Sequence, residues 1–355
     1  MLKDRIFSAR ACLESYSLDA LLVTSLQSIR YLTGFSGSDG ILLLTNDSGC
    51  FLTDSRYTTQ AQSEVSAFPV TEYRIKLDAV VEWLGQHSIK RVGFVASQLT
   101  VAVYNELTCK LPEVEFVALK DEISDIRAVK DRDELVLLER AAVLASASLE
   151  EILPLVRPGV LERELALELE IAMRRRGADD KAFDFIVASG ERGALPHGRA
   201  SEKVISSGEM VTFDFGALCN GYNSDETVTV AVGKQDPRLL DVYTIVKEAH
   251  DRAIDAVRPG IPLKELDRVA RSFIAERGYG PYFGHGLGHG VGLEVHERPL
   301  LSFRSEDKAE VGMVFTVEPG VYIPGLGGVR IEDTVVVEND GCRLLTKFPK
   351  ELQLL

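Results

Sequence analysis

The sequence has few cysteines, and no two of them form a CxxC pair. The five are scattered along the chain, as Cys12, Cys50, Cys109, Cys219 and Cys342. An odd and dispersed set predicts reduced thiols rather than a disulfide framework. Reduced thiols are typical of a cytoplasmic protein, which is the location that we expect.

Long apolar runs are also missing. A stretch such as Ile41–Leu44 is far shorter than the roughly 20 residues that span a bilayer. The N-terminal segment MLKDRIFSARACLE carries charges throughout and lacks the apolar core of a signal peptide. We therefore expect neither a membrane partner nor a secretion signal.

Positive charge is in short supply as well. The chain has 40 Lys and Arg residues against 54 Asp and Glu residues, and its formal net charge is -14. A protein that binds the phosphate backbone needs a basic face, so we expect no nucleic acid partner. The other proportions, 45% hydrophobic and 26% charged residues, are typical of globular domains. A length of 355 residues suffices for two of them.

The first third of the chain alternates helical and extended patterns, which predicts a small α/β domain with helices over a sheet. Helices are expected at residues 3–16 and 54–65, and strands at residues 20–24, 41–44, 50–53, 90–95 and 113–117. A charged stretch at residues 120–132 then precedes a long amphipathic pattern. We therefore place the domain boundary between residues 1–123 and 124–355.

The second domain is predicted to be an α+β unit. Its expected helices are residues 134–153, 163–176, 237–257 and 263–277. The sequences VRPGV at 156–160 and VRPGI at 257–261 each fall between two of these helices. A βαα unit duplicated within the domain would explain this echo.

Two acidic residues occupy a predicted hairpin of the second domain. Asp214 lies in VTFDFGA and Asp225 in YNSDETVTVAV, with an Asn-Gly hairpin signal between them. Because their numbers differ by an odd count, a two-residue loop points both side chains to one face, with Phe213 and Phe215 on the other. Two buried carboxylates repel each other unless a cation neutralises them. The simpler alternative is a solvated hairpin face that carries two acids.

A second acidic pair flanks a glycine-rich turn near the end of the sequence. Glu318 lies in VEPGVY and Glu332 in GVRIEDT, and they can meet across a hairpin whose loop is odd-numbered or bulged. Arg330 shares a face with Glu332, while Ile331 faces away. A structural ion pair would explain Arg330 and Glu332, but it would leave Glu318 without a role.

Histidines concentrate in one glycine-rich segment, GHGLGHGVGLEVHE at residues 284–297. It holds three of the six histidines, namely His285, His289 and His296. Alternating glycines allow the backbone and the imidazoles to approach a ligand closely. An isolated histidine is more often structural, which is how we interpret His87 and His250.

Four carboxylates and one imidazole form an oxygen-rich ligand set. Such a set suits Mn²⁺ or Co²⁺ and tolerates Zn²⁺, and it differs from a structural zinc site built from cysteines. Carboxylates are also natural bridges between two ions that lie about 3.5–4 Å apart. The sequence therefore predicts a site for two divalent metal ions.

The order of these motifs resembles that of the pita-bread metallopeptidases that cleave bonds next to proline, the Xaa-Pro aminopeptidases and prolidases. In the second domain the resemblance depends on PHG at 196–198, FDFGA at 213–217, NSDETVT at 223–229, HGLGHGVGLEVHE at 285–297, VEPGVY at 317–322 and GVRIEDT at 328–334. In the first, TGF at 33–35 and LTDSRY at 52–57 are similar to the creatinase-type N-terminal domain. The resemblance implies a creatinase-like α/β domain followed by an α+β pita-bread catalytic domain.

The resemblance also implies how the ligands divide between two ions. Asp214 is expected to hold one ion, and Asp225 and Glu332 to bridge both. His289 and Glu318 are expected to bind the second ion. Mn²⁺ is the expected metal, with Co²⁺ or Zn²⁺ as alternatives.

Further roles follow from the same resemblance. Glu318 is the expected general base, and His296 the expected hydrogen-bond donor to the oxyanion of the tetrahedral intermediate. His197 and His285 are expected to line a pocket for proline, and Arg330 to support the ligands from behind. A homodimer is the expected assembly.

The implied activity is that of an Xaa-Pro aminopeptidase, which removes the residue before a proline from a peptide. The alternative is an Xaa-Pro dipeptidase, which must recognise the free carboxylate one residue past the cut, normally through an arginine. Leu300 stands where some similar prolidases carry arginine, which leaves Arg298 and Arg304 as candidates.

Three less favoured alternatives share the scaffold. A methionine aminopeptidase would lack the N-terminal domain, creatinase works without metal, and a non-catalytic binding protein would not need five ligands. One departure from the family pattern is Val228, which stands where relatives often carry arginine. We expect it to alter the rim of the site or the residues behind the ligands.

Overall fold

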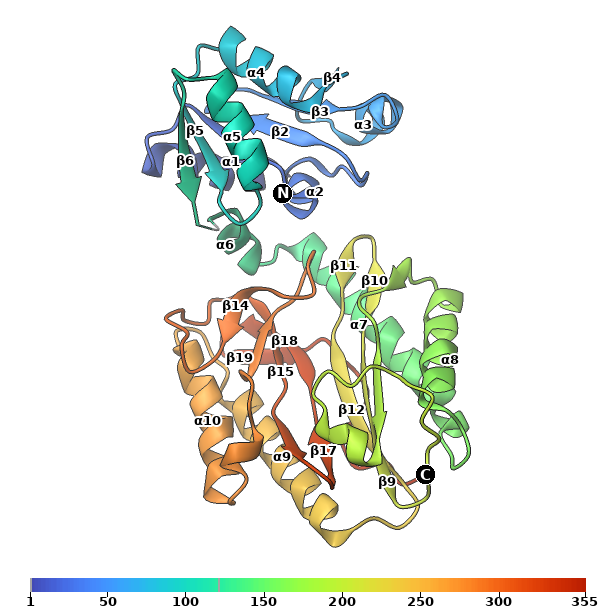
Figure 1. The fold of residues 1–355 in the computed structure, drawn as a ribbon. Helices are drawn as coiled ribbons and strands as arrows, with labels where there is room; N and C mark the ends of the chain where they lie inside the picture. The colour runs from blue at the N-terminus through green and yellow to red at the C-terminus, as the bar shows by residue number, and fades with distance from the viewer. Residues whose placement is uncertain (1, 121) are drawn as a thin grey trace. The chain divides into compact units, whose positions relative to one another are not determined.

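The computed structural model describes residues 2–120 and 122–355. The chain divides into two compact units, Met1–Arg127 and Ala128–Leu355, which Figure 1 shows in blue to green and in green to red. Helix α6 (Glu122–Ala128) contains both this division and the boundary expected between residues 123 and 124. Each unit has its own sheet and its own core, and they are described separately below.

In unit 1 the described residues form a mixed sheet with the strand order β4-β3-β2-β1-β5-β6. Its strands are β1 (Ala20–Val23), β2 (Ile41–Leu44), β3 (Gly49–Thr53), β4 (Val70–Glu72), β5 (Arg91–Val95) and β6 (Glu115–Leu119). β1 pairs antiparallel with β2 and parallel with β5. Every residue of β1 and β2 is buried, as expected for a central strand covered on both faces. The strands predicted from short apolar runs are confirmed.

Unit 1 contains the helices α1 (Leu2–Ser15), α2 (Leu26–Thr33), α3 (Thr58–Glu64), α4 (Lys76–Gln86) and α5 (Val101–Lys110), and α6 begins within it. Of these, α2, α4, α5 and α6 were not predicted. The helix predicted from residue 54 begins only at Thr58, because Asp54 instead accepts a hydrogen bond from the backbone N–H of Arg56 in a turn.

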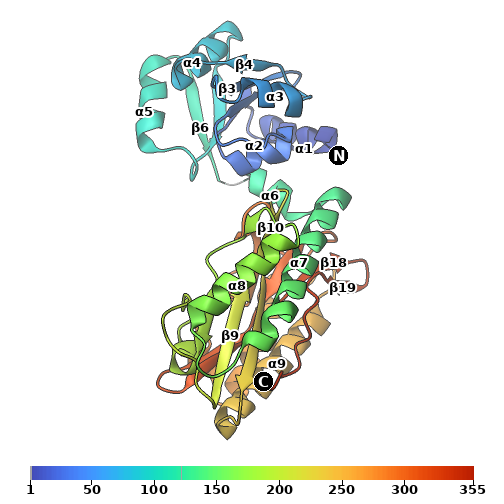
Figure 2. The same ribbon diagram turned by 90° about the vertical axis from the view of Figure 1, so that its right-hand side faces the viewer.

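Unit 2 contains two helix pairs, and each pair covers its own sheet (Figures 1 and 2). The first pair is α7 (Arg132–Ile152) and α8 (Glu162–Arg175), over a sheet with the order β12-β9-β8. The second is α9 (Pro237–Ala256) and α10 (Leu263–Glu276), over a sheet with the order β14-β13-β15-β18-β19. The helices predicted for this domain are confirmed to within a few residues. The two VRPG sequences each connect the helices of one pair, which is consistent with a duplicated unit.

The described residues of unit 2 form the strands β7 to β19. They are β7 (Asp180–Lys181), β8 (Ile186–Ser189), β9 (Glu209–Phe215), β10 (Ala217–Cys219), β11 (Tyr222–Asn223), β12 (Glu226–Val232), β13 (Gly288–Gly290), β14 (Glu297–Leu301), β15 (Val314–Val317), β16 (Gly320–Ile323), β17 (Gly327–Arg330), β18 (Asp333–Glu338) and β19 (Gly341–Leu344). Short 3₁₀ turns follow α7 at Leu153–Leu155, β8 at Gly190–Ala194 and α10 at Gly280–Tyr282.

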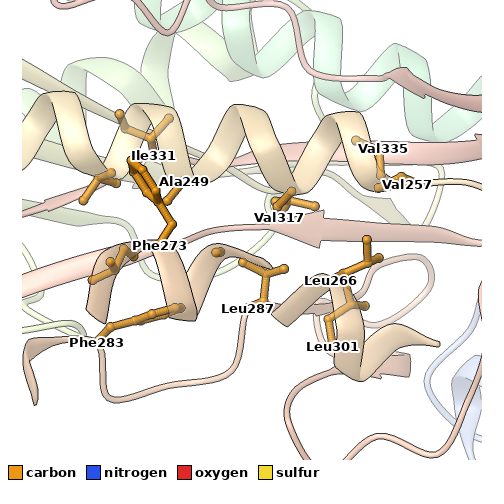
Figure 3. Packing of buried hydrophobic residues seen from close by; sticks show 14 of the residues in the cluster. Ala249, Val257, Leu266, Phe273, Phe283, Leu287, Leu301, Val317, Ile331 and Val335 are labelled. Atoms are coloured by element: carbon orange, nitrogen blue, oxygen red, sulfur yellow. The ribbon is translucent and has the colours of Figure 1, made fainter. Parts of the chain in front are cut away.

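The apolar face of the larger sheet packs on α9 and α10 (Figure 3). Val317 and Ile331 are fully buried there, in one cluster with Ala249 of α9 and Phe273 of α10. Successive side chains of an extended strand point to opposite faces. The residues that follow Val317 and Ile331 in the sequence therefore point away from this core, toward the cavity described next.

None of the helices in the described residues combines the length and the apolarity needed to cross a membrane. All five cysteines are free thiols, as predicted. His87 stacks on Trp83 in unit 1, with ring centroids 4.0 Å apart. His250 is buried beside Asp333, its Nε2 lying 3.2 Å from a carboxylate oxygen. Both histidines have the structural surroundings that were expected.

Candidate metal centre

The first acidic pair lies on one face of the β9–β12 hairpin. Asp214 is directly opposite Thr227, and Asp225 precedes Thr227 by two residues, so the two aspartates are diagonal neighbours. Diagonal positions place Cα atoms about 7–8 Å apart on the same face. Both carboxylates line one cavity, whereas Phe213 and Phe215 are fully buried on the other side. The predicted common face is confirmed.

Val228 lies directly opposite Phe213 in the same hairpin. It belongs to the hydrophobic cluster under α7 and α8 and is 2% exposed. The departure from the family pattern is therefore on the far face of β12 from the ligands, which removes the rim from the two places where we expected its effect and leaves the residues behind the ligands.

The second acidic pair lies where two ladders meet. Gly320 pairs with Arg330 in the β16–β17 hairpin, and Val317 pairs with Asp333 between β15 and β18. Both ladders keep one register, which places Glu318 and Glu332 opposite each other at the junction. The hairpin loop, residues 324–326, is odd-numbered, and this is the condition under which the sequence allowed the two glutamates to meet.

A close backbone approach positions His289. A Cβ atom at Gly288 would lie 2.0 Å from the carbonyl oxygen of Thr316, so only glycine allows β13 to pack this tightly. The backbone N–H of His289 donates to Thr316 Oγ1 at 3.1 Å, and that hydroxyl donates to Glu318 Oε1 at 3.3 Å. One threonine thus orients two predicted ligands.

Three of the five predicted ligands converge on a small volume, and a fourth, Glu318, lies beside them. Asp225, His289 and Glu332 each offer a ligand atom, and these atoms all lie within 4.8 Å of one another. His289 Nε2 is 3.4 Å from Glu318 Oε1 and 3.7 Å from Asp225 Oδ2. Thr227 donates a hydrogen bond of 2.6 Å to Glu332 Oε2, which holds that carboxylate in place.

The charges of this group are not balanced within the protein. Burial and the neighbouring carboxylates raise the pKa of Asp225 and of Glu332 well above their usual ranges. Burial raises the pKa of Glu318 to about 8. These shifts express the cost of bringing several carboxylates together out of water, and divalent cations would remove that cost. The donor set therefore fits divalent metal ions.

His289 has the protonation that a metal ligand needs. Burial lowers its pKa to about 4, so the imidazole is neutral near pH 7. Its Nδ1 lies 3.0 Å from the carbonyl oxygen of Gly290, which can only accept, so Nδ1 carries the proton. The lone pair of Nε2 then faces Glu318 and Asp225, as in many metal-binding histidines.

Arg330 holds Asp214 rather than Glu332. Its Nη2 donates to Asp214 Oδ2 at 2.5 Å, and its Nε donates to Thr227 Oγ1 at 3.1 Å. Its Nη1 donates to the Pro196 carbonyl at 3.0 Å and to the Tyr322 hydroxyl at 2.9 Å. The ion pair that the sequence suggested between Arg330 and Glu332 is thus replaced by one across the site.

Tyr322 connects this arginine to His285. The tyrosine hydroxyl accepts from Arg330 and donates to His285 Nε2 at 2.9 Å, since His285 Nδ1 donates to the Gly286 carbonyl at 2.8 Å. Burial lowers the pKa of His285 to about 4 and raises that of Tyr322 to about 12. The hydrogen-bonded row Arg330–Tyr322–His285 therefore remains in a single protonation state near pH 7.

All the predicted site residues line one cavity of about 700 Å³, and they are His197, Asp214, Asp225, His285, His289, His296, Glu318, Arg330 and Glu332. Its remaining wall includes the apolar Phe183, Ile186 and Leu300 and the charged pair Asp184 and Arg199. The sequence did not single out Thr227, Thr316 or Tyr322. Thr227 lies in the motif NSDETVT, two residues after Asp225, and Tyr322 lies in the motif VEPGVY, four residues after Glu318. Their even spacing from a predicted ligand could have indicated both side chains.

This combination of fold and site defines a two-domain, metal-dependent hydrolase. The profile of Metallopeptidase family M24 matches residues 136–339, and that of the Creatinase/Prolidase N-terminal domain matches residues 5–129. The chain belongs to metallopeptidase family M24. Both domain types predicted from the motifs, the creatinase-like domain and the pita-bread catalytic domain, are confirmed, and so is the peptidase class.

Three similar proteins show how far the likeness extends. An Xaa-Pro dipeptidase of Pyrococcus horikoshii is 41% identical, over 96% of this chain and 96% of its own. The structure of an Xaa-Pro dipeptidase from Bacillus anthracis is 42% identical, with a TM-score of 0.98 and full coverage of both chains. That of an X-Pro aminopeptidase from Thermotoga maritima is 37% identical, with a TM-score of 0.91 and 99% coverage of each.

Proposed function

We propose that the protein is an Xaa-Pro dipeptidase, which hydrolyses the bond between the first residue and the proline of a dipeptide. This proposal rests on the group of buried carboxylates around a neutral His289, in a fold that aligns over its full length with an Xaa-Pro dipeptidase. The sequence favoured the aminopeptidase and kept the dipeptidase as its alternative. The similar proteins support that alternative better.

We further propose two divalent ions, with Mn²⁺ as the expected metal. Asp214, Asp225, His289, Glu318 and Glu332 would hold them. When bound, the ions supply Lewis acidity and neutralise the carboxylates, which suits them to activate water and to stabilise negative charge.

The protein side chains provide the proton transfers. Glu318 is the group best placed to carry a proton from the attacking water to the proline nitrogen, because it faces the cavity beside His289. His296 lines the same cavity with an exposed side chain, and partial burial of its ring lowers its pKa. As a neutral imidazole it can donate one hydrogen bond to the developing oxyanion. His197 and His285 would form the wall against the proline ring.

The test uses metal-stripped protein with Mn²⁺, Co²⁺ or Zn²⁺ restored in turn. We expect Mn²⁺ to restore hydrolysis of the dipeptide Ala-Pro, with slower release of alanine from the tripeptide Ala-Pro-Ala. No hydrolysis of Ala-Pro with any of the metals would refute the proposal.

The second candidate is an Xaa-Pro aminopeptidase. It is favoured by the likeness to the Thermotoga maritima enzyme and by Leu300, which stands where some similar prolidases carry arginine. Faster turnover of Ala-Pro-Ala than of Ala-Pro, with the same metal, would support this candidate.

The homodimer expected from the family resemblance also remains a proposal. Light scattering on the purified, metal-loaded chain would test it, with twice the mass of 39.0 kDa as the expected result. The cytoplasmic location expected from the sequence likewise stays a prediction.

A further inference from the structure

We propose that Arg199 is the residue that recognises the free carboxylate of the dipeptide. This inference rests on the proposed dipeptidase function and assigns the specificity to one side chain. The sequence left Arg298 and Arg304 as candidates for this role. Neither is among the residues that line the cavity, and Arg298 Nη2 instead lies 2.8 Å from Asp307 Oδ2.

Two arginines, and no lysine, line the cavity among the residues that the structure describes: Arg199 and Arg330. Arg330 is 4% exposed and donates to Asp214, Thr227, Tyr322 and the Pro196 carbonyl. Its donors are therefore already used in holding the site together. The side chain of Arg199, by contrast, is 76% exposed.

The strand register places Arg199 at the right distance from the ligands. Ile186 of β8 pairs with Asp214 on one side and forms an isolated bridge with Arg199 on the other. Arg199 is thus two strand spacings from Asp214, or about 10 Å between backbones. Directly paired residues point to the same face, and all three line the cavity.

That separation can hold the part of the substrate beyond the cut together with an arginine side chain. The free carboxylate lies one residue past the cut bond, about 3.5 Å along the chain. If a dipeptide is cut beside the ligands, its carboxylate lies between them and the backbone of Arg199, within the span of an arginine side chain. A planar guanidinium can then bind the carboxylate through two parallel hydrogen bonds.

The present partner of Arg199 is easily exchanged. Arg199 Nη1 lies 3.1 Å from Asp184 Oδ2, and the Asp184 side chain is 51% exposed. Exposed pairs of this kind contribute little to stability. Lys181 Nζ lies 2.9 Å from the other oxygen of Asp184, so Asp184 keeps a cationic partner when Arg199 turns to a substrate.

The backbone of Arg199 is nevertheless held firmly. Its carbonyl accepts a hydrogen bond of 2.7 Å from Arg192 Nη2, and its N–H donates to the His197 carbonyl at 2.9 Å. His197, the predicted proline-pocket residue, thus lies two residues away in the same loop. The backbone of Arg199 is therefore fixed, while its exposed guanidinium is accessible to a substrate carboxylate.

The decisive comparison is between Ala-Pro and its amide, Ala-Pro-NH₂, which differ in the carboxylate charge. On full-length, Mn²⁺-loaded protein we expect Arg199→Met to lower kcat/KM for Ala-Pro about tenfold or more, mainly through KM. The value for the amide should change less than about twofold, within the scatter expected of independent sites. Arg199→Lys, which keeps the charge but not the fork, should recover part of the loss.

The matched control is Arg163→Met. Arg163 is likewise exposed and paired with a surface acid, Glu202, at 2.5 Å, but it does not line the cavity. Arg163→Met should leave kcat/KM unchanged for both Ala-Pro and its amide. Asp184→Asn, which removes one partner of Arg199, should keep the preference for Ala-Pro over its amide.

The outcomes separate the two proposals. Equal losses on Ala-Pro and on the amide, or no loss on either, would overturn the role of Arg199 while leaving the dipeptidase function intact. A loss specific to Ala-Pro in Arg298→Met or Arg304→Met, but not in Arg199→Met, would do the same. Failure of the wild-type protein to hydrolyse Ala-Pro, with Ala-Pro-Ala cleaved, would overturn the dipeptidase function and this inference together.

Discussion

Residues of the proposed metal centre differ in whether their substitution should affect metal binding or catalysis. Asp225 is 4% exposed, and Glu332, Asp214 and Glu318 all raise its pKa. It is thus a buried carboxylate surrounded by other negative charges, and a nearby cation would stabilise its charged form. His296 instead packs against His289 with ring centroids 4.2 Å apart and lines the cavity without being one of the five predicted ligands. These two residues give separate tests of binding and of catalysis.

Asp225→Asn should lower turnover of a Pro-containing dipeptide by more than about a hundredfold. This exceeds the usual effect of losing a residue that only hydrogen-bonds to a metal ligand. The reason is that a neutral amide binds divalent ions poorly in place of a bridging carboxylate. Metal content measured by atomic spectroscopy should fall, while circular dichroism stays native. Glu306→Gln, an exposed acid-to-amide change with a side chain 87% exposed, is the control. Normal activity and metal content in Asp225→Asn would show that the ligand assignment is wrong.

His296→Ala should lower kcat about a hundredfold to a thousandfold, the usual effect of losing one oxyanion donor. Its metal content should match that of the wild type, since His289 supplies the imidazole ligand. His87→Ala, in unit 1, serves as the comparison. If His296→Ala loses metal instead, then the roles of His289 and His296 have been exchanged.

At the scale of elements, the last segment of the chain braces the two strands that follow the proposed bridging ligands. Glu226 and Asp333 come directly after Asp225 and Glu332 in the sequence. Lys350 Nζ lies 2.5 Å from Glu226 Oε1 and 3.1 Å from Asp333 Oδ1, and its side chain is only 6% exposed. One buried cation thus connects β12 with β18, on the side of the strands away from the cavity.

Lys350→Met should destabilise the protein by about 3–5 kcal/mol, because it leaves buried carboxylates without their cation. Urea unfolding would measure this change. The double variant Lys350→Met with Glu226→Gln should lose less than the sum of the two single changes, since one uncompensated charge is gone. Lys347→Met, whose side chain is 44% exposed, should change stability by no more than about 0.5 kcal/mol. Equal effects of the two lysine variants would contradict the bracing role.

At the scale of the whole molecule, the metal centre belongs to unit 2 alone. All the predicted ligands lie within Ala128–Leu355, and unit 1 has its own hydrophobic cluster around Leu43 and Val92. A ligand that binds only the folded state stabilises the part of the chain that forms its site. Metal binding should therefore stabilise unit 2 more than unit 1.

Adding Mn²⁺ to metal-stripped protein should raise the melting temperature of unit 2. At a concentration of about a hundred times Kd, the gain is about 2.7 kcal/mol. Differential scanning calorimetry should show that gain in the transition of unit 2, with the signal from unit 1 unmoved. Asp225→Asn is the control and should show little shift. A transition that does not respond to Mn²⁺ in the wild type would contradict a metal centre in this cavity.

The sequence by itself determined to which face of its strand each predicted ligand points. Odd spacing placed Asp214 and Asp225 together, an odd-numbered loop allowed Glu318 to meet Glu332, and alternating glycines indicated the approach of His289. Apolar runs likewise predicted the central strands of unit 1. These are local properties, because the period of a strand and the length of a turn decide where a side chain points.

Tertiary structure alone decided which distant segments become neighbours. Arg330 pairs with Asp214, 116 positions away, rather than with nearby Glu332, and Lys350 reaches Glu226, 124 positions away. Arg199 lines the cavity because β8 lies between it and Asp214. The helices α2, α4, α5 and α6 were missed for a related reason, since packing outweighs weak helix propensity in short segments. Spacing along a chain sets the direction of a side chain, but only packing of the whole domain sets what it faces.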